Sequence, residues 1–262
     1  MSATPQESWV ALLEDQELVQ VMLDRPDQGR TLGNIFLGRV EAVLPGIQAA
    51  FVDIGHEKAG FLHVSDLNYG DDDEADAENG DGNGGKGGRG RGRPKKYPPI
   101  QENLQKGQTL LVQVTKEPIS SKGSRLTAQV SLPGRFMVYM PHTSHVGVSR
   151  KIEGRDQRSK LRKMAKQIVK PGSGGMIVRT VGEEVTKKKL GNEYRLLSES
   201  WDKIQRRANS GKAPAAVHQE AQLIGGVIRD LFSDKFDAVR IDSKAIYNDV
   251  LEYVKNVDPE LQ

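Results

Sequence analysis

Short runs of apolar residues, separated by turn-forming residues, predict β-structure in the first half of the chain. The first two runs, residues 9–13 and 18–23, flank a polar segment and are typical of a hairpin packed on a sheet. Beyond them, apolar alternation and turns such as Pro45-Gly46 predict five more strands. These lie at residues 35–44, 47–54, 58–64, 110–114 and 126–132. Five short strands with tight turns favour a barrel of the OB-fold type.

Apolar residues recur at helical spacing in the second half of the chain. The helix predicted at residues 193–210 carries four large apolar residues on one side: Leu196, Leu197, Trp201 and Ile204. Further helices are predicted at residues 155–169, 220–232 and 244–255, and short strands at residues 176–180 and 238–241. Strands that alternate with helices predict an α/β domain here.

Composition narrows the class of protein. The chain has 262 residues, enough for one large or two modest domains with their own cores. Cys is 0, which excludes disulfide scaffolds, cysteine-based zinc sites and thiol nucleophiles, and we expect a cytoplasmic protein. No apolar run approaches the ~20 residues that cross a bilayer, so no membrane span is predicted. A net charge of +3 argues only weakly for a polyanionic partner, so the positions of the cations matter more.

Two aromatic residues and several cations of the predicted barrel suit single-stranded nucleic acid. Phe51 on the second strand and Phe61 on the third offer rings on which bases stack, each stacked base contributing roughly 1–3 kcal/mol. Gly60, which precedes Phe61, is expected to leave room beside the ring. The cations predicted to hold phosphates are Lys58, His63, Lys116 and Lys122. The alternative is that both phenylalanines are ordinary core residues.

Three motifs in this region occur in the order of a known RNA-binding domain. They are GRV at residues 38–40, AFVDIG at residues 50–55 and GFLHVSDL at residues 60–67. Together they resemble the S-one type of OB domain, in which the matching aromatic positions face RNA. NIFLGRV at residues 34–40, followed by QAAFVD at residues 48–53, is similar more particularly to the ribonuclease E/G family of bacterial RNA-processing endonucleases. The resemblance implies that Phe51 and Phe61 bind single-stranded RNA.

The resemblance continues into segments that form a 5′-monophosphate sensor in this family. They are SLPGRFMV at residues 131–138, MP at 140–141, GVSRKIEG at 147–154 and GMIVRT at 175–180. Carried over position by position, Arg179 and Thr180 would hold the 5′-phosphate of RNA. Gly134, Val138 and Arg150 would shape or support the pocket. A guanidinium fork and a hydroxyl are suited to a terminal phosphate, whereas without the family both arginines are ordinary surface cations.

The resemblance also implies that catalysis lies outside this chain. Hydrolysis of RNA by the family depends on magnesium held by two aspartates in a deoxyribonuclease-I-like domain, which would begin after Gln262. We therefore expect no catalytic residue, metal or cofactor within the chain, and no cleavage by these residues alone. Besides RNA, a separate catalytic segment or a second copy of the chain is an expected partner.

Other carboxylates and histidines are poor candidates for a metal site. Asp53 and Asp242 each follow apolar residues, but they fall in different predicted domains, whereas a metal nuclease needs carboxylates that converge on one ion. They are better explained as a turn residue before Gly55 and as the N-cap of the last helix. Three histidines lack metal-ligand spacing or a nucleophile partner: His142, His145 and His218.

Residues 71–96 interrupt the barrel with a composition that cannot form a core. An acidic run at residues 71–78 is followed by a glycine-rich basic run, so we expect a disordered insertion that adds phosphate contacts. The sequence RGRGRPKK at residues 89–96 also resembles an AT-hook, whose Arg-Gly-Arg core enters the minor groove of A·T-rich DNA. The acidic run could compete with nucleic acid for the same cations.

Together these patterns predict an α+β multi-domain protein, in which a five-stranded OB-fold barrel is inserted in, or precedes, an α/β domain. The family resemblance implies that this α/β domain is RNase-H-like. The predicted units are an N-terminal hairpin of the α/β domain at residues 1–33, the barrel at 34–132, the 5′-sensor region at 133–180 and the remaining α/β region at 181–262. The predicted function is RNA binding and 5′-end sensing, as the N-terminal part of a ribonuclease E/G-like endoribonuclease. The alternative is a non-catalytic, single-stranded RNA-binding module that regulates transcripts.

Overall fold

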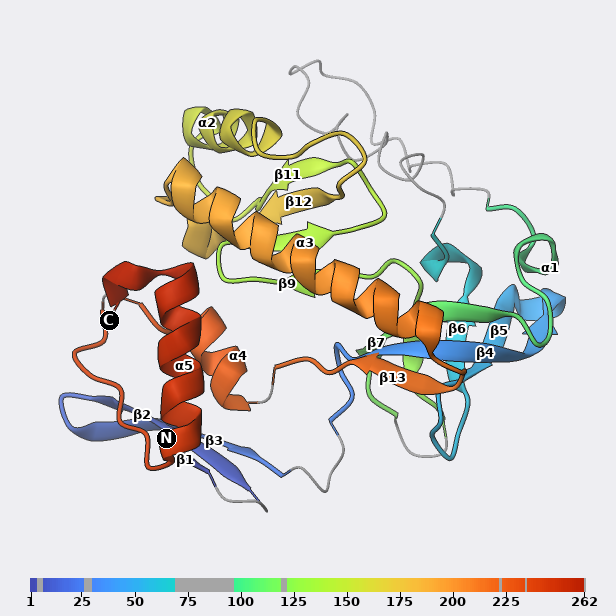
Figure 1. The fold of residues 1–262 in the computed structure, drawn as a ribbon, viewed down its shortest axis with the longest axis horizontal. Coiled ribbons are helices and arrows are strands. Elements are labelled where there is room, and N and C mark those ends of the chain that lie inside the picture. Colours follow the sequence, from blue (N-terminus) through green and yellow to red (C-terminus); the bar gives the residue numbers. More distant parts are fainter. Residues whose placement is uncertain are drawn as a thin grey trace, which may run out of the picture.

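The computed structural model describes residues 1–3, 7–25, 30–68, 97–118, 122–221, 223–233 and 235–261. Within these ranges the strands form three sheets, with the helices packed between and around them (Figure 1). The insertion predicted at residues 71–96 falls outside the described residues. None of the described helices combines the length and the apolar character needed to span a membrane.

The N-terminal hairpin forms as predicted, but it packs on helices. Its strands are β1 (Ser2–Ala3), β2 (Ser8–Glu14) and β3 (Glu17–Asp24). The helices beside it are α4 (Leu223–Asp230) and α5 (Lys244–Val257). Val10 of β2 is fully buried in a core with Ile228 of α4 and Val254 of α5. The Met1 amino group donates to the Arg240 carbonyl at 2.7 Å, so the N-terminus lies against the segment between α4 and α5 (Figure 1).

A closed five-stranded barrel follows the hairpin. Its strands are β4 (Ile35–Leu44), β5 (Ala49–Asp53), β6 (Gly60–His63), β7 (Thr109–Lys116) and β8 (Arg125–Thr127). They are hydrogen-bonded in the order β4-β5-β6-β8-β7, and pairing of β4 with β7 closes the ring. The short helix α1 (Ile100–Asn103) places Ile100 in the barrel core. This architecture is consistent with an OB-fold.

The last barrel strand is shorter than predicted. β8 ends at Thr127, and Leu132 belongs to the next sheet. Between them, the Ala128 N–H donates to the Asp66 carbonyl at 2.7 Å, and the Gln129 side chain donates to the Leu67 carbonyl at 2.9 Å. The chain therefore bends toward the segment after β6, and these contacts replace a continued strand ladder.

A four-stranded sheet carries the region predicted as the sensor. Its strands are β9 (Leu132–Pro133), β10 (Met137–Met140), β11 (Val146–Val148) and β12 (Gly175–Val178), in the order β11-β12-β10-β9. The helices that pack on it are α2 (Arg155–Lys166) and α3 (Lys187–Ser210). Met137 and Met176 share the core beneath them with Leu161 of α2 and Leu190 of α3. Short 3-10 helices elsewhere are η2 (Pro45–Ile47), η3 (Val64–Asp66), η6 (Thr180–Gly182) and η7 (Pro259–Leu261).

An RNase-H-like arrangement of residues 181–262 is not confirmed. The strand described in this range, β13 (Ala215–His218), pairs with β4 at the edge of the barrel. Residues 238–241, which we predicted as a strand, are not one. Besides the bond from Met1 to Arg240, the Asp242 N–H donates to the Met1 carbonyl at 3.2 Å, and these two bonds do not extend into a strand ladder.

Candidate nucleic-acid interface

Phe51 and Phe61 lie side by side on the outside of the barrel. Phe51 of β5 is paired directly with Phe61 of β6, and their ring centroids are 6.2 Å apart with the planes at 67°. Phe51 is 36% exposed and Phe61 is half-buried. Because strand side chains alternate, the neighbouring Val52 and Leu62 point inward and belong to the barrel core. The alternative that both rings are core residues is therefore wrong.

Two cations, Arg125 and Lys116, lie beside these rings on the next two strands of the barrel. Phe61 is paired with Arg125 of β8, and Arg125 lies opposite Lys116 of β7. Side chains of directly paired residues project from the same face of a sheet, so the four residues form one row across four strands. We call Phe51, Phe61, Arg125 and Lys116 the barrel row. Arg125 also donates to Asp66 at 2.9 Å, an exposed contact that contributes little to stability.

Lys58 and Lys122 lie in loops next to the barrel row. Lys58 is in the β5–β6 connection and Lys122 precedes β8, and both side chains are exposed. The two loops touch, because a Cβ on Gly123 would lie 1.9 Å from the Ala59 carbonyl oxygen. The Phe61 N–H donates to the Ser124 carbonyl at 2.8 Å in the same place. These lysines therefore add positive charge at the Phe61 side of the row.

A side chain at Gly60 would point into the barrel, away from Phe61. Our expectation that Gly60 leaves room beside the Phe61 ring is therefore wrong. A Cβ on Gly60 would lie 2.4 Å from Cδ1 of Leu126, because adjacent residues of a strand point to opposite faces. His63, two residues after Phe61, does share its face. The two ring centroids are 6.5 Å apart with an interplanar angle of 22°, which enlarges the aromatic surface.

The polar residues predicted for the 5′-phosphate come together at one edge of the four-stranded sheet. Arg179 and Thr180 follow β12, and Arg150 follows its parallel neighbour β11. The Ser149 N–H donates to the Val178 carbonyl at 2.8 Å, which holds the two strand ends together. The carboxyl ends of neighbouring parallel strands are a common location for ligand sites.

Val138 lies on the same face of this sheet as Arg179. It is paired with Ile177 of β12, and residues 177 and 179 point the same way because they are two positions apart. The neighbours of Val138, Met137 and Tyr139, point the other way and are buried in the core. Val138 is therefore placed to shape this face, as the family resemblance implies.

The guanidinium of Arg179 is held by the protein. Its Nη1 donates to the Gly134 carbonyl at 2.5 Å and to Oδ1 of Asp230 on α4 at 2.7 Å. Burial acts to raise the pKa of Asp230, but hydrogen bonds from Arg229 and Arg179 outweigh it and hold that pKa below its usual range. Asp230 therefore stays ionised at neutral pH and fixes the orientation of the arginine.

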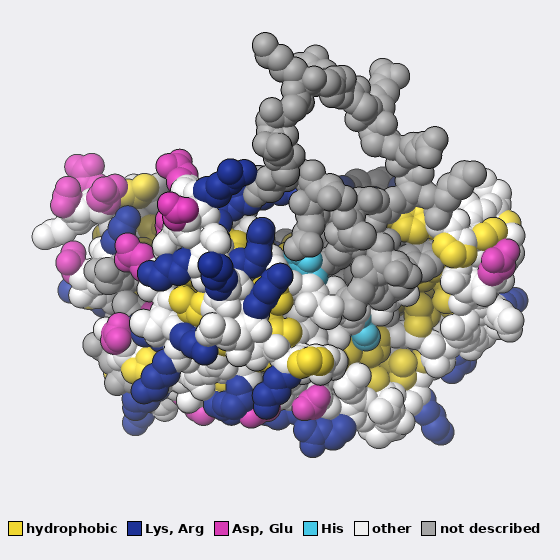
Figure 2. Space-filling view, turned by 90° about the horizontal axis from the view of Figure 1, so that it is seen from above, with side chains coloured by type: hydrophobic (Ala, Val, Ile, Leu, Met, Phe, Trp, Pro, Cys, Tyr) yellow, Lys and Arg dark blue, Asp and Glu magenta, His cyan; other side chains and the backbone are white. Residues whose placement is uncertain are grey.

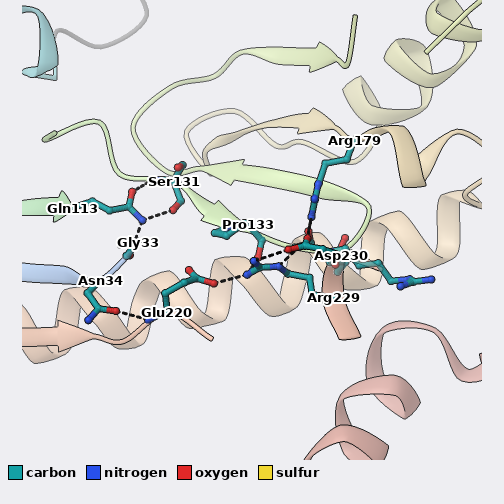
Figure 3. A network of polar contacts seen from close by, with 12 residues as sticks. Gly33, Asn34, Gln113, Ser131, Pro133, Arg179, Glu220, Arg229 and Asp230 are labelled. Carbon is teal, nitrogen blue, oxygen red and sulfur yellow. Dashed lines mark hydrogen bonds and ion pairs between the residues drawn. The ribbon is translucent and has the colours of Figure 1, made fainter. Parts of the chain in front are cut away.

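Figure 3 shows that the contacts of Asp230 continue to the barrel. Arg229 donates to both carboxylate oxygens of Asp230, at 3.2 and 3.1 Å, and its Nη1 bonds Glu220. The Glu220 N–H donates at 2.8 Å to the side-chain oxygen of Asn34, the residue before β4. A continuous chain of polar contacts therefore joins Arg179 to the first barrel strand.

A buried carboxylate occupies the turn between β9 and β10. Glu193 of α3 is 2% exposed and accepts the Arg135 N–H at 2.5 Å and the Phe136 N–H at 2.9 Å. Burial raises the pKa of the Glu193 carboxyl, although these backbone hydrogen bonds act in the opposite direction. The amides of this turn are taken, so Gly134 contributes to the site through its carbonyl and its small size.

Carboxylates and histidines do not assemble a metal site in the part of the chain that the structure describes. Asp53 accepts the Gly55 N–H at 2.8 Å, so its predicted role in a turn is confirmed. The prediction that Asp242 caps the last helix is wrong. Asp242 accepts the Ala3 N–H at 3.2 Å, and Ser243 is the N-cap of α5.

Sequence comparisons agree with this geometry. A closed five-stranded barrel with outward rings in line with cations is an arrangement that OB-fold barrels use to bind single-stranded nucleic acid. Residues 131–262 match the Ribonuclease E/G family. Ribonuclease G of Haemophilus influenzae is 36% identical over 264 residues, and ribonuclease G of Escherichia coli K12 is 35% identical over 261 residues. Each comparison covers 100% of this chain and 50% of the relative.

Ribonuclease E of Nostoc is 37% identical over 226 residues, which cover 86% of this chain and 30% of that protein. The chain therefore belongs to the ribonuclease E/G family. It spans about half the length of the ribonuclease G relatives that it matches.

Proposed function

We propose that this chain binds single-stranded RNA on the barrel row and recognises a 5′-monophosphate beside Arg179. In this proposal it is the substrate-engaging part of an RNA-processing endoribonuclease of its family. The names of its relatives, ribonuclease G and ribonuclease E, support RNA as the partner. The observation that carries the proposal is the outward ring pair of Phe51 and Phe61, in line with two cations.

The barrel row combines the two interactions that single strands require. Phe51 and Phe61 can each stack one base, and two stacked bases supply about 2–6 kcal/mol. A micromolar complex needs roughly 8 kcal/mol, so stacking alone is not enough. The remainder has to come from phosphates held by cations such as Arg125 and Lys116. Binding should therefore weaken as the salt concentration rises.

Arg179 is placed to distinguish a phosphate from a hydroxyl group. Gly134 and Asp230 both accept from its Nη1, which fixes the plane of the guanidinium, and no described residue accepts from its Nη2, which can donate to an anion. The fork of Arg229 compensates the charge of Asp230, so a phosphate would not meet an unpaired carboxylate. The exposed Thr180 offers a hydroxyl as a second donor next to it.

Removing the rings tests RNA binding. Phe51→Ala and Phe61→Ala should each weaken binding of the full chain to a 5′-hydroxyl oligouridylate by roughly 5- to 150-fold, the equivalent of about 1–3 kcal/mol. Tyr247→Ala is the control, because this α5 residue is a 49% exposed aromatic outside the barrel. Unchanged affinity in both ring variants, measured by fluorescence anisotropy, would refute the barrel row.

A second arm of the experiment tests end recognition. Arg179→Ala should reduce the ratio of affinities for 5′-monophosphorylated and 5′-hydroxyl RNA of the same sequence, because the fork that reads the phosphate is gone. Lys203→Ala removes an exposed cation of α3 and should leave the ratio unchanged. An Arg179→Ala variant that keeps the wild-type ratio rules out the sensor and leaves the barrel proposal standing.

A further inference from the structure

Helix α2 has the highest net charge of the helices that the structure describes. Its sequence, RDQRSKLRKMAK, contains six cations and one anion, which gives a net charge of +5. The whole chain has a net charge of +3, so all other residues together carry −2. The net charge of α2 alone therefore exceeds that of the whole chain, and the barrel row does not account for it.

Three lysines of α2 face away from the protein. Leu161 and Ala165 are buried against the four-stranded sheet, whereas Lys160, Lys163 and Lys166 are exposed. Figure 2 shows dark blue side chains gathered over the part of the molecule where Figure 1 places α2. The helix therefore presents a basic outer face about 18 Å long, at 1.5 Å per residue.

Three lysines of α2 lack an ionic partner in the part of the chain that the structure describes. Among the described residues, Lys160, Lys163 and Lys166 form no ion pair. Arg162 has a buried Nε with no hydrogen-bond partner within the same described part of the chain. Cations three and four positions apart on a helix repel each other, so this face is destabilised until an anion binds. In α3, by contrast, Arg195 is paired with Glu199 at 2.6 Å.

The start of α2 lies close to the strand ends that carry Arg150 and Arg179. Arg150 and Lys151 follow β11 and lead into α2, and both are exposed. The Ser149 N–H is bonded to the carbonyl of Val178, the residue before Arg179. The start of α2 therefore lies near the backbone at the end of β12, whereas the Arg179 side chain points to the other face of the sheet, toward Asp230.

The chemistry of this face favours RNA over an acidic polypeptide. Protein interfaces have an apolar centre, but no large hydrophobic residue of α2 is exposed among the described side chains. A face of closely spaced cations without apolar anchors suits a regular chain of phosphates. We propose that the outer face of α2 is a second RNA-binding surface, which holds phosphates of a single-stranded RNA. This inference rests on the proposed function.

The test removes three charges from α2 of the full chain. A variant with Lys160→Gln, Lys163→Gln and Lys166→Gln keeps residues with good helix propensity. Each lost phosphate contact should reduce the slope of log K against log salt by about 0.7 for a single strand, or by about 2 for all three. The matched control removes three exposed lysines elsewhere and should keep the wild-type slope: Lys203→Gln, Lys212→Gln and Lys255→Gln.

The probe is a 5′-hydroxyl oligouridylate, so that recognition of a 5′-monophosphate does not contribute to the slope of log K against log salt. A wild-type slope in the α2 variant, together with weakened binding by Phe51→Ala, overturns the α2 surface alone. A wild-type chain that does not bind this RNA overturns the proposed function as well. An α2 variant that binds RNA normally but loses binding to polyglutamate assigns the face to an acidic polypeptide and overturns the inference. Circular dichroism confirms that both triple variants are folded.

Discussion

At the scale of single residues, the position of Gly134 shows how closely the end-recognition edge is packed. A Cβ at this position would lie 2.6 Å from Oε1 of Glu193 and 2.9 Å from Cδ1 of Leu197. The backbone of Gly134 is not in the left-handed region, so the requirement is for space. The same carboxylate is needed by the backbone amides of Arg135 and Phe136.

Replacing Gly134 by alanine should therefore destabilise the protein. We expect Gly134→Ala to lower the free energy of unfolding by about 1–3 kcal/mol, because displacing Glu193 leaves buried N–H groups without an acceptor. Gly46→Ala is the control, since a Cβ there meets nothing within 4 Å. Urea denaturation measures both variants. Equal midpoints for the two variants would contradict this explanation of the turn.

The sequence did not predict the site residues whose contacts are made with residues far away in the chain. Leu126 belongs to the barrel core, and adjacent residues of a strand point to opposite faces. Alternation within this strand could therefore have predicted from the sequence that Arg125 points outward. That Arg125 lies beside Phe61 depends on the parallel pairing of β6 with β8. Asp230 bonds Arg179 from 51 residues away, a distance at which no spacing rule applies.

At the scale of elements, α4 connects the end-recognition edge to the rest of the molecule. Its last residue, Asp230, bonds Arg179, and the preceding Arg229 bonds Glu220. Removing the carboxylate would leave two arginines close together without the anion between them. The contribution of Asp230 also depends on pH, because its pKa is lowered in the folded protein.

Asp230→Asn should lower the free energy of unfolding at neutral pH by about 1 kcal/mol, a modest value because the carboxylate is 35% exposed. A lowered pKa stabilises the fold fully above the unfolded value of about 3.9, and this stabilisation is lost as the pH falls through the folded value. The difference between wild type and variant should therefore vanish in acid. Urea denaturation across this pH range measures it, with the exposed Asp249→Asn as control. A difference that persists in acid would contradict an ionic role.

Elements long enough to contain several repeats of the apolar pattern were easier to predict than short ones. The last helix was expected at residues 244–255 and is observed as Lys244–Val257, because its apolar residues repeat over several turns. β10 and β11 contain 4 and 3 residues, too few for alternation to be recognised, and were missed. The strand expected at residues 238–241 was wrong for another reason, since Val239 packs against the helix-packed core around Val10 and the segment has no strand partner among the described residues.

At the scale of the whole molecule, α3 lies between the barrel and α2, which carry two of the proposed RNA-binding surfaces. Figure 1 shows it running from the four-stranded sheet to β13 at the edge of the barrel. The barrel core has its own residues, which include Val52, Leu62, Val112 and Leu126. Each of them lies outside residues 69–96, so barrel stability and the charge of the predicted insertion can be separated by experiment.

Deleting the two halves of the predicted insertion separately should move RNA binding in opposite directions. Without residues 71–78, six carboxylates that compete for cations are gone, so affinity for an oligouridylate should rise at low salt. Without residues 86–96, six cations are lost, so affinity should fall and its salt dependence should become weaker. Both deletions should keep the thermal midpoint of the intact chain, because the named core residues are unchanged. An unfolded product would show that the segment belongs to the barrel, and equal shifts in both deletions would show that its charge does not act on RNA.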